Sequence, residues 1–215
     1  MPRTTPARRM DELSTVTLDQ VREAVLTPEG RRAYDVIELS KGACAVVYTF
    51  TGPARTMTLG PCDADGPHVP LNSVIVKVGK WKRVADLYAE VDIQRTANEL
   101  GLAPAVYDFA VVGKAGAKVS GVVVMQRLTQ PTYYRWLHWL TRADRRSSGE
   151  DARPWTIDRA VLASPLARQW EGEARRLKGL LLEAGVEHGD WHERNLVFDV
   201  PEVRERFFDM ESPRD

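Results

Sequence analysis

The sequence predicts an α+β fold, in which an antiparallel sheet of five strands with one inserted helix precedes a mostly helical half. Between residues 33 and 125, short runs rich in Val, Ile and Tyr alternate with turn residues, as strands do. One amphipathic, strongly charged stretch at 81–100 interrupts these runs and has the apolar spacing of a helix. After residue 126 the apolar residues recur every three or four positions, which is typical of helices.

The chain starts with a Pro-, Arg- and Thr-rich segment, and a short helix follows at 17–26. The apolar residues of this stretch have helical spacing. Thr17 or Thr15 is the predicted N-cap, and Pro28 with Gly30 is expected to end the helix. We expect this helix to pack on the domain that follows.

Three strands are predicted next. Residues 33–39 and 45–50 flank a small-residue turn and predict a hairpin. Residues 52–70 are rich in Pro and Gly and predict a surface loop. Residues 71–78 then predict an apolar strand that carries Lys77 near its end.

The amphipathic helix at 81–100 follows, and Gly101 is its expected stop. Residues 105–112 and 120–125 predict two more strands, which a Gly- and Lys-rich turn joins. The order of strand, strand, strand, helix, strand, strand favours an antiparallel sheet over alternating βαβ units.

The second half predicts helices at 131–140 and 165–185, with a charged loop at 142–154 between them. The sheet-rich half gives way to the helical half near residues 126–130. This organisation divides the chain into an N-terminal extension, a sheet domain and a helical domain, at 1–30, 31–128 and 129–215.

The composition of the 215-residue chain excludes several classes of protein. Its 30 Lys and Arg residues balance 30 Asp and Glu residues, whereas a dedicated nucleic-acid binder usually has a basic excess. No apolar run has the length of a membrane span, and no apolar stretch of a secretory signal follows Met1. Cys44 and Cys62 favour reduced thiols over a disulfide framework. We expect a cytoplasmic protein (in a host cell, if its source is a pathogen or virus) that binds neither nucleic acid nor membrane.

Polar residues surround a short apolar run near residue 200. The run at 196–198 predicts a strand, and the run at 206–208 predicts a second strand that ends on Asp209. A hairpin between them would bring Asn195 close to Asp209, with Asp190 on the preceding loop. Two oxygen ligands beside a potential base are what magnesium-dependent phosphoryl transfer requires.

Three earlier stretches extend this pattern. They are Leu-Ser-Lys-Gly-Ala-Cys-Ala-Val-Val-Tyr at 39–48, Val-Ile-Val-Lys-Val at 74–78 and Val-Val-Val-Met-Gln-Arg-Leu at 122–128. Together with His-Gly-Asp-Trp-His-Glu-Arg-Asn at 188–195, and in this order, they resemble the motifs of the protein kinase-like superfamily. The resemblance covers residues 33–211 and implies a two-lobed fold with a five-stranded N-lobe and a truncated, mostly helical C-lobe.

The resemblance also implies ATP and Mg²⁺ as cofactors. The residues expected to contact the nucleotide belong to the glycine-rich loop, the lysine strand and the hinge between lobes: Gly42, Ala45, Val47, Lys77, Met125, Gln126 and Leu128. Only the central glycine of the loop motif is present, so a plain hairpin turn is the alternative there. Likewise, a buried strand followed by a linker describes the hinge residues equally well.

Lys77 is the residue that the resemblance assigns to the α- and β-phosphates. A lysine on an apolar strand must be paired or reach a pocket, because an isolated buried charge is costly. Glu90 on the following helix is the expected partner, with Asp86, Asp92 and Glu99 as competitors. An edge-strand lysine in solvent is the plain alternative.

For the loop at 188–195, the resemblance implies that Asp190 accepts or orients the proton of the attacking hydroxyl. Asn195 and Asp209 would bind magnesium. A zinc site at His188 and His192 is an alternative, as is a polar turn before a hairpin.

The implied activity is transfer of the ATP γ-phosphate to a hydroxyl group, with the catalytic roles on Asp190, Lys77 and Glu90. Only four residues follow Glu211, so the sequence is either part of a longer kinase or a minimal kinase, and we expect a minimal atypical serine/threonine protein kinase. Gly189 and His192 are closer to the aminoglycoside and choline phosphotransferases, which makes a small-molecule kinase the first alternative. A non-catalytic kinase-fold binding module is the second. A protein partner could then use the aromatic cluster at 133–139, which is otherwise the core face of a helix.

Overall fold

The structure is a computed structural model that describes residues 15–42, 44–52, 55–58, 68–115, 118–130, 132–148, 157, 159–187, 189, 191 and 195–197. The chain divides into two compact units, residues 1–127 and 128–215. Within the described ranges, no helix is both long and apolar enough to cross a membrane.

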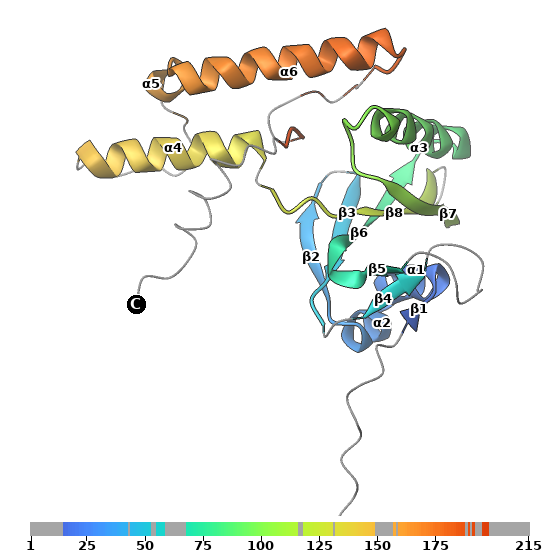
Figure 1. Ribbon diagram of the computed structural model, residues 1–215. Coiled ribbons are helices and arrows are strands. Elements are labelled where there is room, and N and C mark those ends of the chain that lie inside the picture. The colour runs from blue at the N-terminus through green and yellow to red at the C-terminus, as the bar shows by residue number, and fades with distance from the viewer. Residues whose placement is uncertain are drawn as a thin grey trace, which may run out of the picture. The chain divides into compact units, whose positions relative to one another are not determined.

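An antiparallel sheet of five strands forms the centre of the first unit, in the order β2-β3-β6-β8-β7 (Figure 1). Its strands are β2 (Val36–Lys41), β3 (Ala45–Phe50), β6 (Val74–Trp81), β7 (Val106–Ala115) and β8 (Lys118–Gln126). The helix α3 (Val84–Glu99) lies between β6 and β7 in the chain. The predicted α+β class, with five antiparallel strands and one inserted helix, is therefore confirmed.

A second, smaller sheet corrects the prediction of a surface loop at 52–70. Its strands are β1 (Thr15–Val16), β4 (Thr56–Thr58) and β5 (His68–Pro70), in the order β1-β4-β5. β1 pairs in parallel with β4, about forty residues away in the chain. Because that pairing is non-local, the Pro- and Gly-rich local pattern did not indicate it.

One face of the five-stranded sheet is covered by the N-terminal helix α1 (Leu18–Leu26). We call it the aliphatic face, and its core residues are fully or almost fully buried: Val74, Val76, Val122 and Val124 from the sheet with Val21, Ala24 and Val25 from α1. Alternation along a strand sends these side chains to the same side. The expectation that this helix packs on the sheet domain is met.

The boundaries of α1 follow from its caps. The Thr17 side chain accepts a hydrogen bond from the Gln20 amide, and the Gln20 side chain accepts one from the Thr17 amide, which completes a capping box. The helix ends before Pro28, as predicted, but Pro28 also begins the short helix α2 (Pro28–Ala33). Proline suits a first helical position because its missing N–H has no partner there anyway. The next strand consequently starts at Val36 and not at residue 33.

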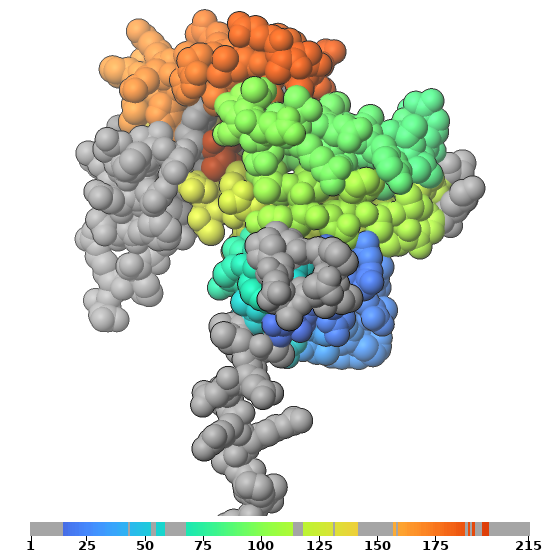
Figure 2. Space-filling model, turned by 45° about the vertical axis from the view of Figure 1, so that its right-hand side comes forward, coloured from blue at the N-terminus to red at the C-terminus, as the bar shows by residue number. Residues whose placement is uncertain are grey.

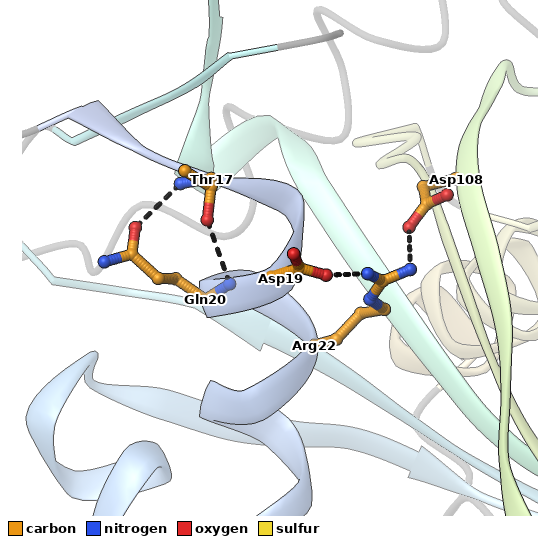
Figure 3. Close-up of polar contacts among 5 residues, drawn as sticks. All are labelled: Thr17, Asp19, Gln20, Arg22 and Asp108. Carbon is orange, nitrogen blue, oxygen red and sulfur yellow. Dashed lines mark hydrogen bonds and ion pairs between the residues drawn. The ribbon is translucent and has the colours of Figure 1, made fainter. Parts of the chain in front are cut away.

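An ion pair also ties α1 to the sheet (Figure 3). Arg22 contacts Asp19 in its own helix and donates to Asp108 of β7 over 2.7 Å. Both side chains of the longer-range pair are about one quarter exposed. The pair therefore links α1 to an edge strand of the sheet near the aliphatic core.

The opposite face carries α3, and we call it the lysine face because Lys77 belongs to it. Leu87 and Val91 of α3 are buried against Trp81 and Val123 of the sheet. Figure 2 shows α3 in green above the yellow-green β7–β8 layer, with the N-terminal residues in blue below. Trp81, predicted to start the helix, is instead the last residue of β6. The first three residues of the predicted strand, Leu71–Ser73, form a 3₁₀ turn.

The second unit is helical in its described part, with α4 (Tyr133–Ser148), α5 (Arg159–Leu162) and α6 (Pro165–Glu183). Its core is aromatic, since Trp136 and Trp170 stack with ring centroids 4.0 Å apart and Tyr133 packs beside them. Tyr133 and Trp136 thus belong to the core face of a helix. α4 extends into the predicted charged loop as far as Ser148.

Candidate functional site

Lys77 and Glu90 form an ion pair between the central strand β6 and the helix α3. The Lys77 Nζ and a Glu90 carboxylate oxygen are 2.5 Å apart, a charge-assisted hydrogen bond. The two side chains are 31% and 40% exposed, so the pair is reachable from solvent. Lys77 therefore has a fixed partner and is not a free edge-strand lysine.

The spacing of α3 explains why Glu90 is the partner. Leu87 and Val91 face the sheet, and Glu90 lies on the same side of the helix because it is three residues from Leu87. Of the competitors, Asp86 instead accepts hydrogen bonds from Arg83, and Asp92 and Glu99 are exposed. The helix thus presents one carboxylate to Lys77.

Trp81 is a third member of this group. Its indole Nε1–H donates to the second Glu90 carboxylate oxygen over 2.8 Å, and its ring centroid lies 5.9 Å from the Lys77 Nζ. Glu90 therefore accepts one hydrogen bond from each of two side chains of the same strand. The indole is 9% exposed, which places this neutral donor in a largely dry environment.

Two glycines make room for the indole. A Cβ at Gly79 would lie 2.7 Å from Trp81 Cη2, and a Cβ at Gly121 would lie 3.0 Å from Trp81 Cζ3 and 2.8 Å from Leu87 Cδ2. Gly79 and Gly121 are direct partners across β6 and β8. The bare backbone of both strands thus forms the surface on which Trp81 lies and α3 approaches.

Four of the residues expected to contact a nucleotide share the lysine face. Val47 is directly opposite Lys77, Ala45 is opposite Gly79, and Met125 is opposite Ile75. Directly opposed residues of antiparallel strands point to the same side, and so do residues two apart along one strand. Ala45, Val47 and Met125 are half-buried, which gives an apolar, partly open strip beside the Lys77 ammonium.

Gly42 and the hinge residues have other surroundings. Gly42 lies in the β2–β3 connection, where its N–H donates to the Ala45 carbonyl over 2.8 Å. The Gln126 N–H donates to the Ala105 carbonyl, and its side chain accepts from the Ala105 amide. Leu128 is exposed and is the first residue of the second unit. The described contacts of Gln126 are thus within the sheet unit.

The loop expected to carry the catalytic base is described only in part. Asp190 and Asp209 lie outside the described residues, as do His188, His192 and the predicted strand at 206–208. Asn195 is exposed, and next to it Leu196 accepts a hydrogen bond from the Tyr133 amide over 2.8 Å.

The flanks of that loop are attached to the helical unit. Val197 forms an antiparallel bridge with Thr132, immediately before α4. Trp191 and Leu196 pack against the aromatic core of α4 and α6. Asn195 therefore lies between two residues, Trp191 and Leu196, that pack against the second unit's own core.

A second ion pair on α3 shows what an ordinary surface pair looks like. Arg83 and Asp86 are three residues apart, with Nη2 and Oδ1 separated by 2.7 Å. The hydrogen bond from Arg83 lowers the pKa of Asp86, and the bond to Asp86 raises the pKa of Arg83. This pair is local, between residues three apart in the chain, and its Arg83 side chain is 78% exposed.

Trp81, Gly79 and Gly121 were missed from the sequence. The available signal was the spacing Lys77-x-Gly79-x-Trp81, which places all three residues on one face of a strand. Gly121 could not be found without the pairing register of β6 with β8.

No protein-family model matches the chain, and a search among curated proteins gives no match. Among the described residues, no group of three or more His, Cys, Asp and Glu side chains could hold a metal ion. The magnesium ligands expected from the sequence include Asp209, which is not among those residues.

Proposed function

We propose that the protein is an ATP- and Mg²⁺-dependent phosphotransferase, an atypical serine/threonine protein kinase. The observation that carries the proposal is the ion pair between Lys77 on β6 and Glu90 on α3. In protein kinases a lysine on the third strand pairs with a glutamate on the following helix, and both must be in place for catalysis. Here β6 is the third strand of the five-stranded sheet in chain order, and α3 is the helix that follows it.

The residues beside Lys77 suit a nucleotide. The ammonium group can neutralise phosphate oxygens while Glu90 fixes its direction, because a paired lysine loses less entropy on binding than a free one. The half-buried strip of Ala45, Val47 and Met125 offers apolar contact to a flat base.

The remaining roles are carried by residues of the C-terminal loop. We assign Asp190 to orienting the attacking hydroxyl and accepting its proton. Asn195 and Asp209 would hold magnesium, for which amide and carboxylate oxygens are suitable ligands. Bound magnesium supplies charge neutralisation at the phosphates. Met125, Gln126 and Leu128 would contact the adenine side of the nucleotide, and Gly42 its phosphate side.

Transfer of labelled γ-phosphate tests the proposal. The full chain with Mg²⁺ and labelled ATP should label itself or a generic acceptor such as myelin basic protein. Asp190→Ala should abolish labelling and leave Mg·ATP binding largely intact, whereas Asp209→Ala should weaken Mg·ATP binding itself. Full labelling by Asp190→Ala would overturn the base assignment, and no nucleotide binding by the wild type would overturn the whole proposal.

Gly189 gives a reason to test a second acceptor class. Typical protein kinases have Arg at this position, whereas His-Gly-Asp is closer to kinases of small alcohols. ATP consumption that depends on an amino sugar or a choline-like alcohol, without protein labelling, would assign the chain to a small-molecule kinase. A chain that binds Mg·ATP but transfers phosphate to neither acceptor would be a binding module.

A further inference from the structure

We propose that Trp81 is a positioning residue that holds Glu90 against Lys77, so that the ion pair is set by the sheet itself. This inference rests on the proposed function for its consequence in ATP binding. Its structural content, a hydrogen bond that fixes Glu90, can be measured without any activity.

A lysine–glutamate pair without a further donor would hold Glu90 only weakly. Both side chains are long and between 31% and 40% exposed, and a pair of this kind gains little net free energy. Water and alternative rotamers compete with such a contact. A second donor on the carboxylate removes part of that freedom.

Trp81 supplies that donor from a rigid position. Its Nε1–H is 2.8 Å from one Glu90 oxygen, while Lys77 Nζ contacts the other. A tryptophan side chain has two rotatable bonds, and this one lies over Gly79 and Gly121 in the same core cluster as Leu87. The indole therefore fixes the carboxylate more firmly than a flexible donor would.

Lys77 and Trp81, the two residues that donate to Glu90, belong to the same strand. Lys77 and Trp81 are four residues apart on β6 and face the same side, so they move as one body. Glu90 is consequently bound at both oxygens by a single rigid element. α3 is therefore held with its glutamate directed at Lys77.

Gly79 and Gly121 provide the space that the contact between Trp81 and Glu90 requires. Gly79 allows the indole to lie back along the strand toward Lys77, and Gly121 allows α3 to approach. A methyl group at Gly121 would meet Leu87 Cδ2 at 2.8 Å and Trp81 Cζ3 at 3.0 Å. Gly121→Ala should therefore displace the indole and the helix together and weaken the same contact without removing any polar group.

The direct test is the indole N–H signal of Trp81 in a ¹⁵N–¹H spectrum, identified among the six tryptophans by its loss in Trp81→Phe. In the wild type this proton should exchange slowly with water. In Glu90→Ala the signal should move, and its exchange should accelerate by roughly tenfold, the effect of losing one hydrogen bond of about 1.4 kcal/mol. An indole signal that is the same in wild type and Glu90→Ala would overturn the proposal.

The functional test compares two ligands on one variant. Trp81→Phe keeps an aromatic ring on the glycine surface but removes the donor. Its Kd for Mg·ATP should rise roughly 3- to 10-fold, the range expected for one net hydrogen bond. Its Kd for adenosine, which has no phosphates, should stay the same.

The outcomes separate the two proposals. If the wild type binds Mg·ATP and Trp81→Phe binds it equally well, the positioning role is overturned and the proposed function stands. Equal weakening for adenosine and Mg·ATP would indicate a merely structural tryptophan, which also overturns it. If the wild type binds no Mg·ATP, the proposed function fails, and the indole signal in Glu90→Ala still decides whether Trp81 fixes Glu90.

Discussion

The two faces of the five-stranded sheet differ in chemistry although they belong to the same strands. On the aliphatic face, Val74, Val76, Val122 and Val124 are fully buried in the core that includes residues of α1. On the lysine face, the same central strand presents a cation, a glycine and an indole donor at alternate positions.

The difference shows how one strand can serve stability and chemistry at once. Alternation assigns every second residue of β6 to each face, so apolar burial on one side leaves the other side free for polar groups. On the lysine face those polar groups satisfy one another, because Glu90 accepts from both Lys77 and Trp81. The predictions below separate the contributions of the two faces.

Lys77→Met should have the largest effect, and on function alone. Removal of the ammonium should lower phosphate transfer by roughly a hundredfold or more, the scale of losing one charge-stabilising group. Because the Lys77 side chain is partly exposed to solvent, the Tm of this variant should stay close to that of the wild type. Arg83→Met is the matched control, since Arg83 also pairs with a carboxylate of α3, and it should transfer phosphate normally.

Phe50→Ala should affect stability alone. Phe50 is 2% exposed in the core of the aliphatic face, and such truncations cost about 3–5 kcal/mol. Urea denaturation should show this loss, and the remaining folded protein should keep its wild-type Kd for Mg·ATP. A weakened Kd in the folded fraction would mean that the two faces are not independent.

Leu87→Ala should lower both the stability of the fold and the affinity for Mg·ATP. Leu87 of α3 is fully buried against the sheet, and its truncation should cost about 2–5 kcal/mol. Leu87 packs α3, the helix that carries Glu90, against the sheet. The Kd for Mg·ATP should therefore also rise by several fold. Comparison with Phe50→Ala in the same assays would show whether this coupling belongs to the lysine face.

Arg22→Gln tests the attachment of α1 to the sheet. The change removes a donor from the partly buried Asp108 carboxylate, which should cost about 1–2 kcal/mol. Thr17→Ala, which removes the α1 cap without touching the sheet, is the comparison variant and should cost about 1 kcal/mol. Neither variant should alter Mg·ATP affinity.

The smallest effect on stability should come from removal of the Arg83–Asp86 pair, and this effect should depend on pH. The bond from Arg83 lowers the pKa of Asp86, so the pair stabilises the fold above the unfolded carboxyl pKa of about 4. That stabilisation is lost as the pH falls through the lowered folded-state pKa. Asp86→Asn should thus slightly lower Tm near neutral pH, and the difference from wild type should vanish in strong acid. A difference that grows on acidification would contradict the sign.

The sequence allowed much of the sheet unit to be predicted, because the signals were local. Alternating apolar residues indicated the strands, and the spacing of Leu87 and Val91 indicated α3. β4 and β5 were missed since their pairing with β1 depends on distant residues. Trp81 was assigned to the helix because a tryptophan beside a charged run fits either element.

In the candidate site, too, the contributions that depend on distant residues could not be predicted from the sequence. The pair of Lys77 with Glu90 could be expected because the resemblance to the protein kinase-like superfamily implies a carboxylate partner on the next helix, and the structure brings the two together. The contributions of Trp81 and Gly121 depend on how an indole lies across two paired strands. That arrangement requires the register and the rotamer, which no local pattern supplies.

The central claim is that the lysine face binds the phosphates of Mg·ATP. Thermal unfolding of the full chain at rising Mg·ATP concentration tests it most directly, because a ligand of the folded state stabilises by about 2.7 kcal/mol at a hundred times its Kd. Tm should rise with Mg·ATP for the wild type and Arg83→Met, and much less for Lys77→Met. An unchanged Tm at millimolar Mg·ATP, or an equal rise for Lys77→Met, would contradict the claim.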